Sequence, residues 1–360
     1  MPEPEPELAL ALVGFGNVGR RFLRLLDEAS ERLEFQWRLV AIGTRHHGSV
    51  VDGEGIDARH ALATVGAGHS LSRLDADPHA RSGIDVVRQV TDALAEEAND
   101  GRLVVVETTV LDVERGEPAT AHVHASLEGL AHVVTANKGP AAFAYRDLAQ
   151  LALSVNRSFL FEGAVMDGIP VFNLVRDTLP GVAIEGFRGV INTTCQFALS
   201  EMEQGASFDD AIGEMQARGI AEADPSLDVD AWDAAAKTSA LANVLMGADI
   251  TPHDVARMGI RGVAPADLAH AARSGRRIRL IASASWRGGR LAARVEPEVL
   301  DAGDPLACLG PLENALYLRT EVLGEVGIVQ RSSSLQHTAY ALLSDLTSIA
   351  RRLQVPSSAR

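Results

Sequence analysis

Two charged residues stand four positions apart in the segment 228–246, which is rich in alanine and leucine. If this segment is a helix, Asp233 and Lys237 lie on the same face. A lysine whose pKa is tuned by burial and a neighbouring carboxylate can give a proton to an oxygen, or hold a developing alkoxide. The simpler interpretation is a surface ion pair that supports the helix. The spacing alone leaves both interpretations open.

A second lysine follows a segment of strand character. Residues 131–135 are predicted to form a strand, and Lys138 lies just past its carboxyl end. The strand predicted at 103–107 is followed in the same way by Thr108 and Thr109. Open α/β sheets bind ligands at the carboxyl ends of their strands, so these side chains are candidates for one site. The alternative for Lys138 is a surface lysine in a turn.

A glycine-rich turn near the N-terminus is the element expected to organise this site. The apolar segment 8–13 precedes the turn, and a segment with apolar residues at helical spacing follows it. The turn has the pattern G-x-G-x-x-G in the strand–turn–helix context of dinucleotide-binding folds, with an ordinary βα turn as the alternative. Its free helix N–H groups would bind a pyrophosphate. The predicted cofactor-binding residues are Gly14, Phe15, Gly16, Asn17, Val18 and Gly19.

The second predicted strand, 38–43, bears on the choice of dinucleotide. NAD-binding folds usually carry an acidic residue after this strand, but here Thr44, Arg45, His46 and His47 follow. Arg45 can pair a 2′-phosphate through two hydrogen bonds, which favours NADP and leaves NAD as the alternative. A solvated basic loop is the simpler interpretation. A metal site is disfavoured, because no further ligands follow the histidines at a suitable spacing.

Composition excludes several classes of partner. The net charge of −15 disfavours nucleic acid and anionic membranes as partners. No apolar run reaches the roughly 18 residues of a membrane span. The chain has only two cysteines, Cys195 and Cys308, which predicts a reducing, cytoplasmic location without a disulfide framework. The expected partner is a small molecule.

Several further motifs, in order along residues 8–355, resemble those of the homoserine dehydrogenase family. They are HVVTANKGP at 132–140, FLFEGAVMDGIP at 159–170, GVINTTCQF at 189–197, GIAEADP at 219–225 and DVDAWDAAAK at 228–237. Because the motifs keep consistent separations, together they are far more specific than any one of them. The chain resembles the short form of the family, which has no regulatory ACT domain.

The resemblance implies a role for each matching residue. Lys237 would be the catalytic lysine and Asp233 its partner, while Lys138 would lie by the nicotinamide and the substrate, with Thr108 and Thr109 along the nicotinamide. The implied substrate-binding residues are Glu222, which would take the ammonium group, Asp228 and Thr194. The implied site for a monovalent cation, Na⁺ or K⁺, consists of Glu162 and the carbonyl groups of Val165, Asp167 and Ile169, which are hard oxygen ligands.

Three stretches depart from the family pattern, and all are expected near the cofactor and substrate. Residues 166–167 replace two small residues, 192–196 lack a glycine, and 330–334 replace a glycine-rich stretch. Arg331 would contact a phosphate or a substrate carboxylate, unless its loop lies further out. These departures leave the expected fold unchanged and bear on the substrate.

The predicted fold class is α/β. We expect a disordered tail over 1–7 and a Rossmann-type doubly wound domain over 8–150, completed by a C-terminal helix at 338–355. Residues 151–330 would form an α+β domain for substrate binding and homodimerisation. Its predicted strands are 183–191, 277–286, 291–299 and 314–322, with a hairpin turn at Gly288 and Gly289.

The function implied by the resemblance is that of an oxidoreductase. It would transfer hydride between NADP(H) and L-homoserine or L-aspartate 4-semialdehyde, in the synthesis of threonine, methionine and isoleucine. One alternative is a dehydrogenase of the same family for another hydroxy or amino-alcohol acid. The other is an NADP-binding regulatory or partner protein without turnover.

Overall fold

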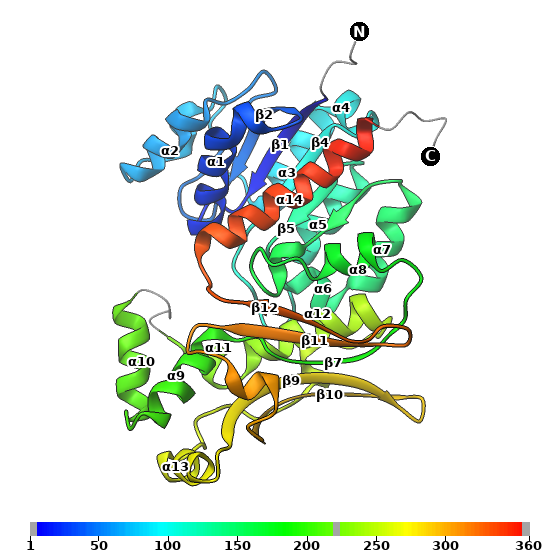
Figure 1. Ribbon diagram of the computed structural model, residues 1–360. Helices are drawn as coiled ribbons and strands as arrows, with labels where there is room; N and C mark the ends of the chain where they lie inside the picture. Colours follow the sequence, from blue (N-terminus) through cyan, green and yellow to red (C-terminus); the bar gives the residue numbers. More distant parts are fainter. Residues whose placement is uncertain (1–5, 219–223, 355–360) are drawn as a thin grey trace. The chain divides into compact units, whose positions relative to one another are not determined.

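The computed structural model describes residues 6–218 and 224–354. The chain divides into two units (Figure 1). The first takes its described residues from Met1–Pro140, Ala144–Pro170 and Ser334–Arg360, and the second from Ala141–Phe143 and Val171–Ser333. In the described part of the chain, no helix is both long and apolar enough to span a bilayer.

The first unit is built on a mainly parallel sheet with the strand order β3-β2-β1-β4-β5-β6, in which only the β2–β3 pair is antiparallel. Its strands are β1 (Glu7–Val13), β2 (Gln36–Gly43), β3 (Ser49–Val51), β4 (Leu103–Glu107), β5 (His132–Thr135) and β6 (Phe159–Leu160). The order changes direction at β1, which pairs with both β2 and β4. Doubly wound sheets bind ligands at the carboxyl ends of the strands at such a switch point.

Helices cover both faces of this sheet. They are α1 (Asn17–Ala29), α2 (Ala58–Gly66), α3 (Gly83–Ala93), α4 (Ala95–Asn99), α5 (Ala119–Glu128), α7 (Tyr145–Ser154) and α14 (Leu335–Gln354), with 3₁₀ turns η1 (Ser30–Arg32), η2 (Leu71–Leu74) and η3 (Glu162–Ala164). Within the short helix α6 (Gly139–Phe143), the chain first passes from the first unit to the second, at Ala141.

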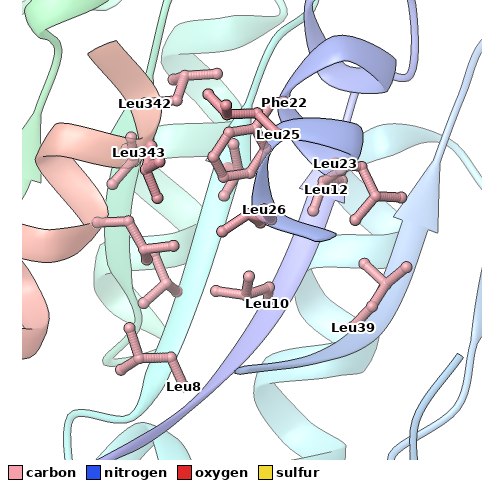
Figure 2. Packing of buried hydrophobic residues seen from close by; sticks show 14 of the residues in the cluster. Leu8, Leu10, Leu12, Phe22, Leu23, Leu25, Leu26, Leu39, Leu342 and Leu343 are labelled. Carbon is pink, nitrogen blue, oxygen red and sulfur yellow. The ribbon is translucent and has the colours of Figure 1, made fainter. Parts of the chain in front are cut away.

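The alternation of β1 explains how its sheet is buried on both sides. Leu8, Leu10 and Leu12 point to one face and pack in a cluster with side chains of α1 and α14 (Figure 2). Ala9 and Ala11 point to the other face and pack with α3. A fully buried leucine side chain contributes roughly 1.5–3 kcal/mol, so the leucine face anchors α1 and α14 to the strand that leads into the glycine turn.

The second unit contains a mixed sheet with the order β12-β11-β7-β9-β10-β8, antiparallel except for the β10–β8 pair. Its strands are β7 (Ile184–Val190), β8 (Ala256–Arg257), β9 (Arg277–Arg287), β10 (Arg290–Leu300), β11 (Asn314–Thr320) and β12 (Gly324–Gln330). Its helices are α8 (Phe172–Thr178), α9 (Thr193–Glu203), α10 (Phe208–Ala217), α11 (Ser226–Val229), α12 (Trp232–Met246) and α13 (Pro265–Arg273), with 3₁₀ turns η4 (Pro252–Asp254) and η5 (Pro305–Cys308).

The predicted Rossmann-type α/β fold class is confirmed, and the differences lie in detail. Residue 150, the predicted domain boundary, lies inside α7. The first unit continues beyond it, because β6 pairs with β5 in the same sheet. Residues 324–330 form β12, a strand not predicted because two glycines dilute its β-branched residues. Gly288 and Gly289 make the predicted hairpin turn, both with positive φ.

Candidate active site

The predicted acid–base pair lies on α12. Lys237 Nζ is 3.0 Å from Asp233 Oδ2, and the two side chains are only 15% and 16% exposed. Nζ also donates to the main-chain oxygen of Ile191, at 2.8 Å, just past the end of β7. An ion pair that serves only a solvated helix face would be more exposed and would not be tied to a second element.

The side chain of Asn192 joins this pair to a second carboxylate. Its Nδ2 donates to Asp228 Oδ1 at 2.7 Å and to Asp233 Oδ2 at 3.0 Å. Its Oδ1 accepts the backbone N–H of Cys195, at 2.9 Å, and so caps α9. Asn192 therefore holds two acidic side chains beside one lysine.

The surroundings of the Asp228 carboxyl group disfavour its charged form. Burial raises its pKa, the charge of Asp233 raises it further, and hydrogen bonds from Asn192 and Thr194 oppose the shift, as does the charge of Lys237. The predicted substrate-site residues Asp228 and Thr194 thus meet in the second unit. Cys195 lies beside them, with Sγ 3.2 Å from the Asp228 carbonyl oxygen. Burial raises the pKa of its thiol well above the ordinary value.

The turn between α11 and α12, which separates Asp228 from Asp233, is held by two arginine side chains. Arg261 Nε pairs with Asp230 Oδ1 at 2.6 Å. Arg257 donates to the Asp230 carbonyl oxygen at 2.8 Å and lies 3.4 Å above the Trp232 ring. A Cβ on Gly259 would come within 2.2 Å of the Val229 carbonyl oxygen, so only glycine fits there. Glu222, the predicted ammonium ligand, lies outside the described residues.

The glycine turn of the first unit combines one tight contact with open space. A Cβ on Gly19 would meet the carbonyl oxygen of Gly14 at 2.7 Å, so this glycine permits close packing of α1 on the turn. Gly14 itself has φ +95. By contrast, a Cβ on Gly16 would meet no protein atom within 4 Å, and no side chain caps the α1 N-terminus. The turn thus leaves backbone N–H groups and space suited to a phosphate.

The end of β4 lies next to the turn. Thr108 donates its N–H to the Val13 carbonyl oxygen at 2.7 Å and its hydroxyl to the Gly14 carbonyl oxygen at 2.9 Å. Lys138 is half-buried and precedes α6 directly. Phe15 is buried, whereas Asn17 is exposed.

Arg45 is exposed after β2, where it was predicted to select the dinucleotide. Its loop is folded by local hydrogen bonds. Thr44 Oγ1 donates to the Gly48 carbonyl oxygen at 2.9 Å and accepts the His47 N–H at 2.7 Å. The guanidinium group therefore stands on an ordered turn at the carboxyl edge of the sheet.

The three departures from the family pattern are accommodated within the chain. Asp167 adopts φ +50, a left-handed conformation that glycine would take more easily, and its carboxylate accepts the Thr338 hydroxyl at 3.3 Å. Asn192 and Cys195 form the contacts described above. Arg331 pairs with Glu313 at 2.8 Å, which occupies it with a carboxylate of its own unit.

The predicted cation-site residues follow β6. Glu162 is buried, and its N–H donates to Asp345 Oδ2 on α14 at 2.8 Å. Val165 is also buried, while Asp167 and Ile169 are half-buried. Among the described residues, no group of three or more histidine, cysteine or acidic side chains is placed to hold a metal ion.

Comparison with known proteins decides the family. The family model for homoserine dehydrogenase matches residues 170–347. A NAD(+)-dependent homoserine dehydrogenase of Pseudomonas canavaninivorans is 37% identical over 95% of this chain and 96% of its own length. A homoserine dehydrogenase of Methanocaldococcus jannaschii is 34% identical over 94% and 98%. The chain belongs to the homoserine dehydrogenase family.

Solved structures agree with this assignment. A putative homoserine dehydrogenase from Archaeoglobus fulgidus matches with a TM-score of 0.80 and 30% identity, over 95% of this chain and 99% of the other. A hyperthermophilic archaeal homoserine dehydrogenase in complex with NADPH matches with a TM-score of 0.74 and 27% identity, over 97% and 99%. As a homoserine dehydrogenase family member, the chain is an NAD(P)-dependent oxidoreductase that acts on a CH–OH donor.

Two residues of the structure, Asn192 and Glu107, were given no role by the sequence of this homoserine dehydrogenase family member. Asn192 lies in the motif 189–197 and in the departing stretch 192–196, but no role of its own was predicted for it. Glu107, which ends the buried strand β4, is an acidic residue in an apolar run. A charge at such a position is a signal in itself, because a buried carboxyl group needs hydrogen-bond partners.

Proposed function

We propose that this protein is a homoserine dehydrogenase that transfers hydride between NADP(H) and L-homoserine or L-aspartate 4-semialdehyde. Its place would be the aspartate-derived route to threonine, methionine and isoleucine. The observation that carries the proposal is the mostly buried Lys237–Asp233 pair, which Asn192 connects to Asp228.

The lysine content supports a chemical role for this pair. Of 33 lysine and arginine residues, only Lys138 and Lys237 are lysines. Arginine serves for surface charge and bidentate ion pairs, but its guanidinium does not give up a proton near neutral pH, whereas a lysine pKa responds to its environment. A chain that uses arginine almost everywhere and keeps lysine at two predicted site positions is consistent with proton transfer there.

The residues of the Lys237–Asp233 pair and those around Asp228 take different tasks in the proposal. Lys237 moves the proton at the substrate's terminal oxygen, and Asp233 orients the ammonium group that does so. Asp228 and Thr194, with Glu222, bind the amino-acid end of the substrate. The raised pKa of Asp228 supports this role. The substrate's ammonium group, bound beside Asp228 and Asp233, would offset the repulsion between these two carboxylates.

The first unit is proposed to hold NADP, with NAD as the alternative. The bound nicotinamide would accept or supply the hydride. The open space at Gly16 and the uncapped start of α1 fit a pyrophosphate, and the exposed Arg45 fits a 2′-phosphate. Thr108, Thr109 and Lys138 would line the nicotinamide. Relatives named for NAD(+) and structures with NADPH both occur, so Arg45 is the reason for favouring NADP.

A monovalent cation is proposed at Glu162 and the carbonyl groups of Val165, Asp167 and Ile169. One carboxylate among carbonyl oxygens suits Na⁺ or K⁺ better than a divalent ion, which usually takes several carboxylates. Replacing K⁺ and Na⁺ in the assay by a bulky organic cation should lower activity in the wild type. Glu162→Gln should remove that dependence if the assignment holds.

A homodimer formed through the second unit is also proposed. Large apolar side chains are exposed on its sheet and hairpins, namely Trp286, Val299, Val322, Leu323 and Val329. Light scattering should give twice the mass of the 360-residue chain. A monomeric mass at assay concentration would contradict this part of the proposal.

One experiment tests the central proposal. Purified protein is mixed with L-homoserine and either NADP⁺ or NAD⁺, and the absorbance of the reduced cofactor is followed. Turnover with homoserine supports the proposal. Turnover only with another hydroxy or amino-alcohol acid would identify a different substrate, and cofactor binding without turnover on any alcohol would indicate a binding protein.

A further inference from the structure

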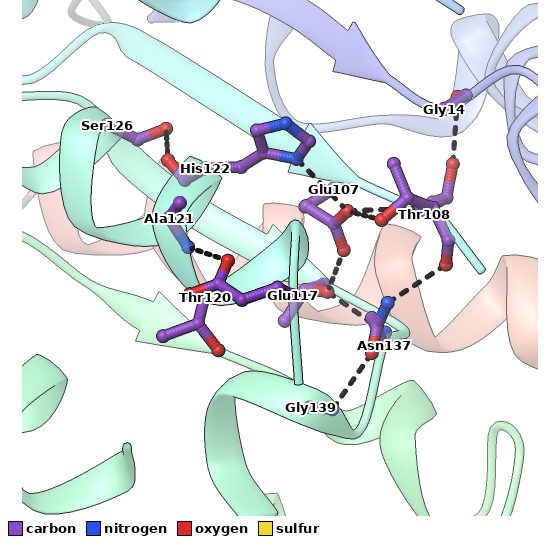
Figure 3. A network of polar contacts seen from close by, with 12 residues as sticks. Gly14, Glu107, Thr108, Glu117, Thr120, Ala121, His122, Ser126, Asn137 and Gly139 are labelled. Atoms are coloured by element: carbon purple, nitrogen blue, oxygen red, sulfur yellow. Dashed lines mark hydrogen bonds and ion pairs between the residues drawn. The ribbon is translucent and has the colours of Figure 1, made fainter. Parts of the chain in front are cut away.

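The carboxyl group of Glu107 is fully buried at the end of β4 (Figure 3). Its neighbour across the sheet is Thr135, at the end of β5. Oε1 accepts both the N–H of Thr109, at 3.1 Å, and its hydroxyl. Oε2 accepts the hydroxyl of Thr135 at 3.0 Å. The ring atom Nδ1 of His122, on α5, lies 3.5 Å from the same oxygen, Oε1. One acid therefore holds the segments that follow two neighbouring strands.

These bonds continue to the residues around Lys138. The Thr135 oxygen that donates to Glu107 accepts the N–H of Asn137 at 2.9 Å. Asn137 in turn donates Nδ2 to the Thr109 carbonyl oxygen at 3.0 Å, and its Oδ1 accepts the Gly139 N–H at 2.8 Å. The backbone on both sides of Lys138 is thus fixed by a closed network that starts at Glu107.

We propose that Glu107 is a positioning residue for the cofactor. It places Thr109 directly, through their hydrogen bonds. It places Lys138 through Thr135 and Asn137. The inference rests on the proposed dinucleotide-binding function and adds a residue that touches neither cofactor nor substrate. A buried carboxyl group costs free energy unless its hydrogen bonds are satisfied. The three donors of Glu107 offset that cost, and the segments that supply them are those expected to line the nicotinamide.

Glu107→Gln is the decisive change, because it keeps size and shape. An amide has one acceptor oxygen, whereas Thr109 and Thr135 need one oxygen each. If the amide oxygen serves Thr109, the Thr135 hydroxyl faces an N–H donor and loses the acceptor that fixes its orientation. The reverse orientation releases Thr109 instead. In either case one of the two segments loses its anchor.

A second pair of variants tests the same network without touching the acid. Thr135→Val removes the connecting hydroxyl at nearly constant volume, and Thr135→Ser keeps it. Ser126→Ala is the matched control, since Ser126 is also fully buried but donates only to the His122 carbonyl oxygen within its own helix, at 2.7 Å. This design separates the network from a general loss of a buried hydroxyl.

The experiment measures dissociation constants of NADPH and NADH by fluorescence without substrate, together with melting temperatures and the Michaelis constants for cofactor and homoserine. Glu107→Gln and Thr135→Val should bind the preferred cofactor about tenfold more weakly or worse, which corresponds to about 1.4 kcal/mol. Thr135→Ser and Ser126→Ala should bind like the wild type. The Michaelis constant for cofactor should rise more than that for homoserine.

The outcomes that overturn the inference differ from those that overturn the function. Variants that melt earlier but bind cofactor like the wild type would show that Glu107 supports only stability. The same conclusion follows if Thr135→Ser fails to restore binding. If Glu107→Gln does not fold, the Thr135 pair decides. Wild-type protein that binds neither dinucleotide would overturn the proposed function, and this inference with it.

Discussion

The amide of Asn192 and the ammonium group of Lys237 reach the same oxygen atom of Asp233, each at 3.0 Å. The other contact of the amide, to Asp228, brings a second carboxylate into the group. A single neutral side chain therefore determines how two acids share one lysine. In the proposed chemistry, Asn192 matters for proton transfer as well as for capping α9.

Asn192→Asp should separate these two contributions. Aspartate caps a helix as well as asparagine does, so α9 should stay intact. The variant loses the donor and adds a third acid, and hydrogen bonds to charged groups are worth roughly 1.5–3 kcal/mol, so kcat/KM for homoserine should fall roughly tenfold to a hundredfold. Steady-state kinetics and thermal melting together read out the two effects.

The control for this variant is Ser207→Ala, which removes the N-cap of α10 away from the lysine. It should cost about 1 kcal/mol of stability and leave kcat/KM unchanged. Wild-type activity in Asn192→Asp would mean that the two carboxylates do not need the amide.

Lys237→Ala should lower kcat by about 10²–10⁴-fold, the usual contribution of general acid–base catalysis. Cofactor affinity should stay the same, because Lys237 is assigned to the substrate oxygen. The measurements are steady-state turnover and fluorescence titration with reduced cofactor. A rate within a few-fold of the wild type would show that another group moves the proton.

Asp228→Asn should change how stability depends on pH. The pKa of Asp228 is raised in the folded protein, chiefly by burial, so the folded state holds this proton more tightly than the unfolded chain does. Wild-type stability should therefore fall as pH rises from about 3.9, the pKa expected in the unfolded chain, through the raised folded value. Asp228→Asn lacks this loss.

Urea unfolding over a pH series measures the difference. The variant should gain free energy of unfolding relative to the wild type as pH rises through that window, with no further gain above it. A stability difference that is independent of pH would contradict the assignment of the strained carboxyl group to Asp228.

Arg45→Ala should reduce the preference for NADP over NAD. The side chain is exposed and can form two hydrogen bonds to a 2′-phosphate, so its loss should lower kcat/KM with NADP by about tenfold or more. The value with NAD should change little. Equal losses with both cofactors would indicate that Arg45 supports its loop and does not read the phosphate.

The glycines of the first turn should respond differently to the same substitution. Gly19→Ala places a methyl group 2.7 Å from the Gly14 carbonyl oxygen, and overpacking of this kind costs about 1–3 kcal/mol, so the protein should melt earlier. Gly16→Ala meets no protein atom, so stability should stay near that of the wild type while cofactor binding weakens. Normal cofactor affinity in Gly16→Ala would place the pyrophosphate elsewhere.

Local sequence patterns determined much of this protein. The alternation of leucine and alanine in β1 requires a strand buried on both faces, and the spacing of Asp233 and Lys237 requires that they share a helix face. The glycines after β1 and the hairpin at Gly288 follow from backbone sterics, which a few neighbouring residues decide. Such features depend on short-range geometry and can be read from the chain.

Only the tertiary structure decided which distant residues meet. Asn192 and Asp228 are far from each other in sequence, and their contact depends on how α9 packs beside the turn before α12. Glu107 gains the Thr135 hydroxyl as a donor because β4 and β5 are paired in register. The sequence left Arg331 either beside a ligand or on a loop further out, and its ion pair with Glu313 depends on the fold bringing these two distant residues together.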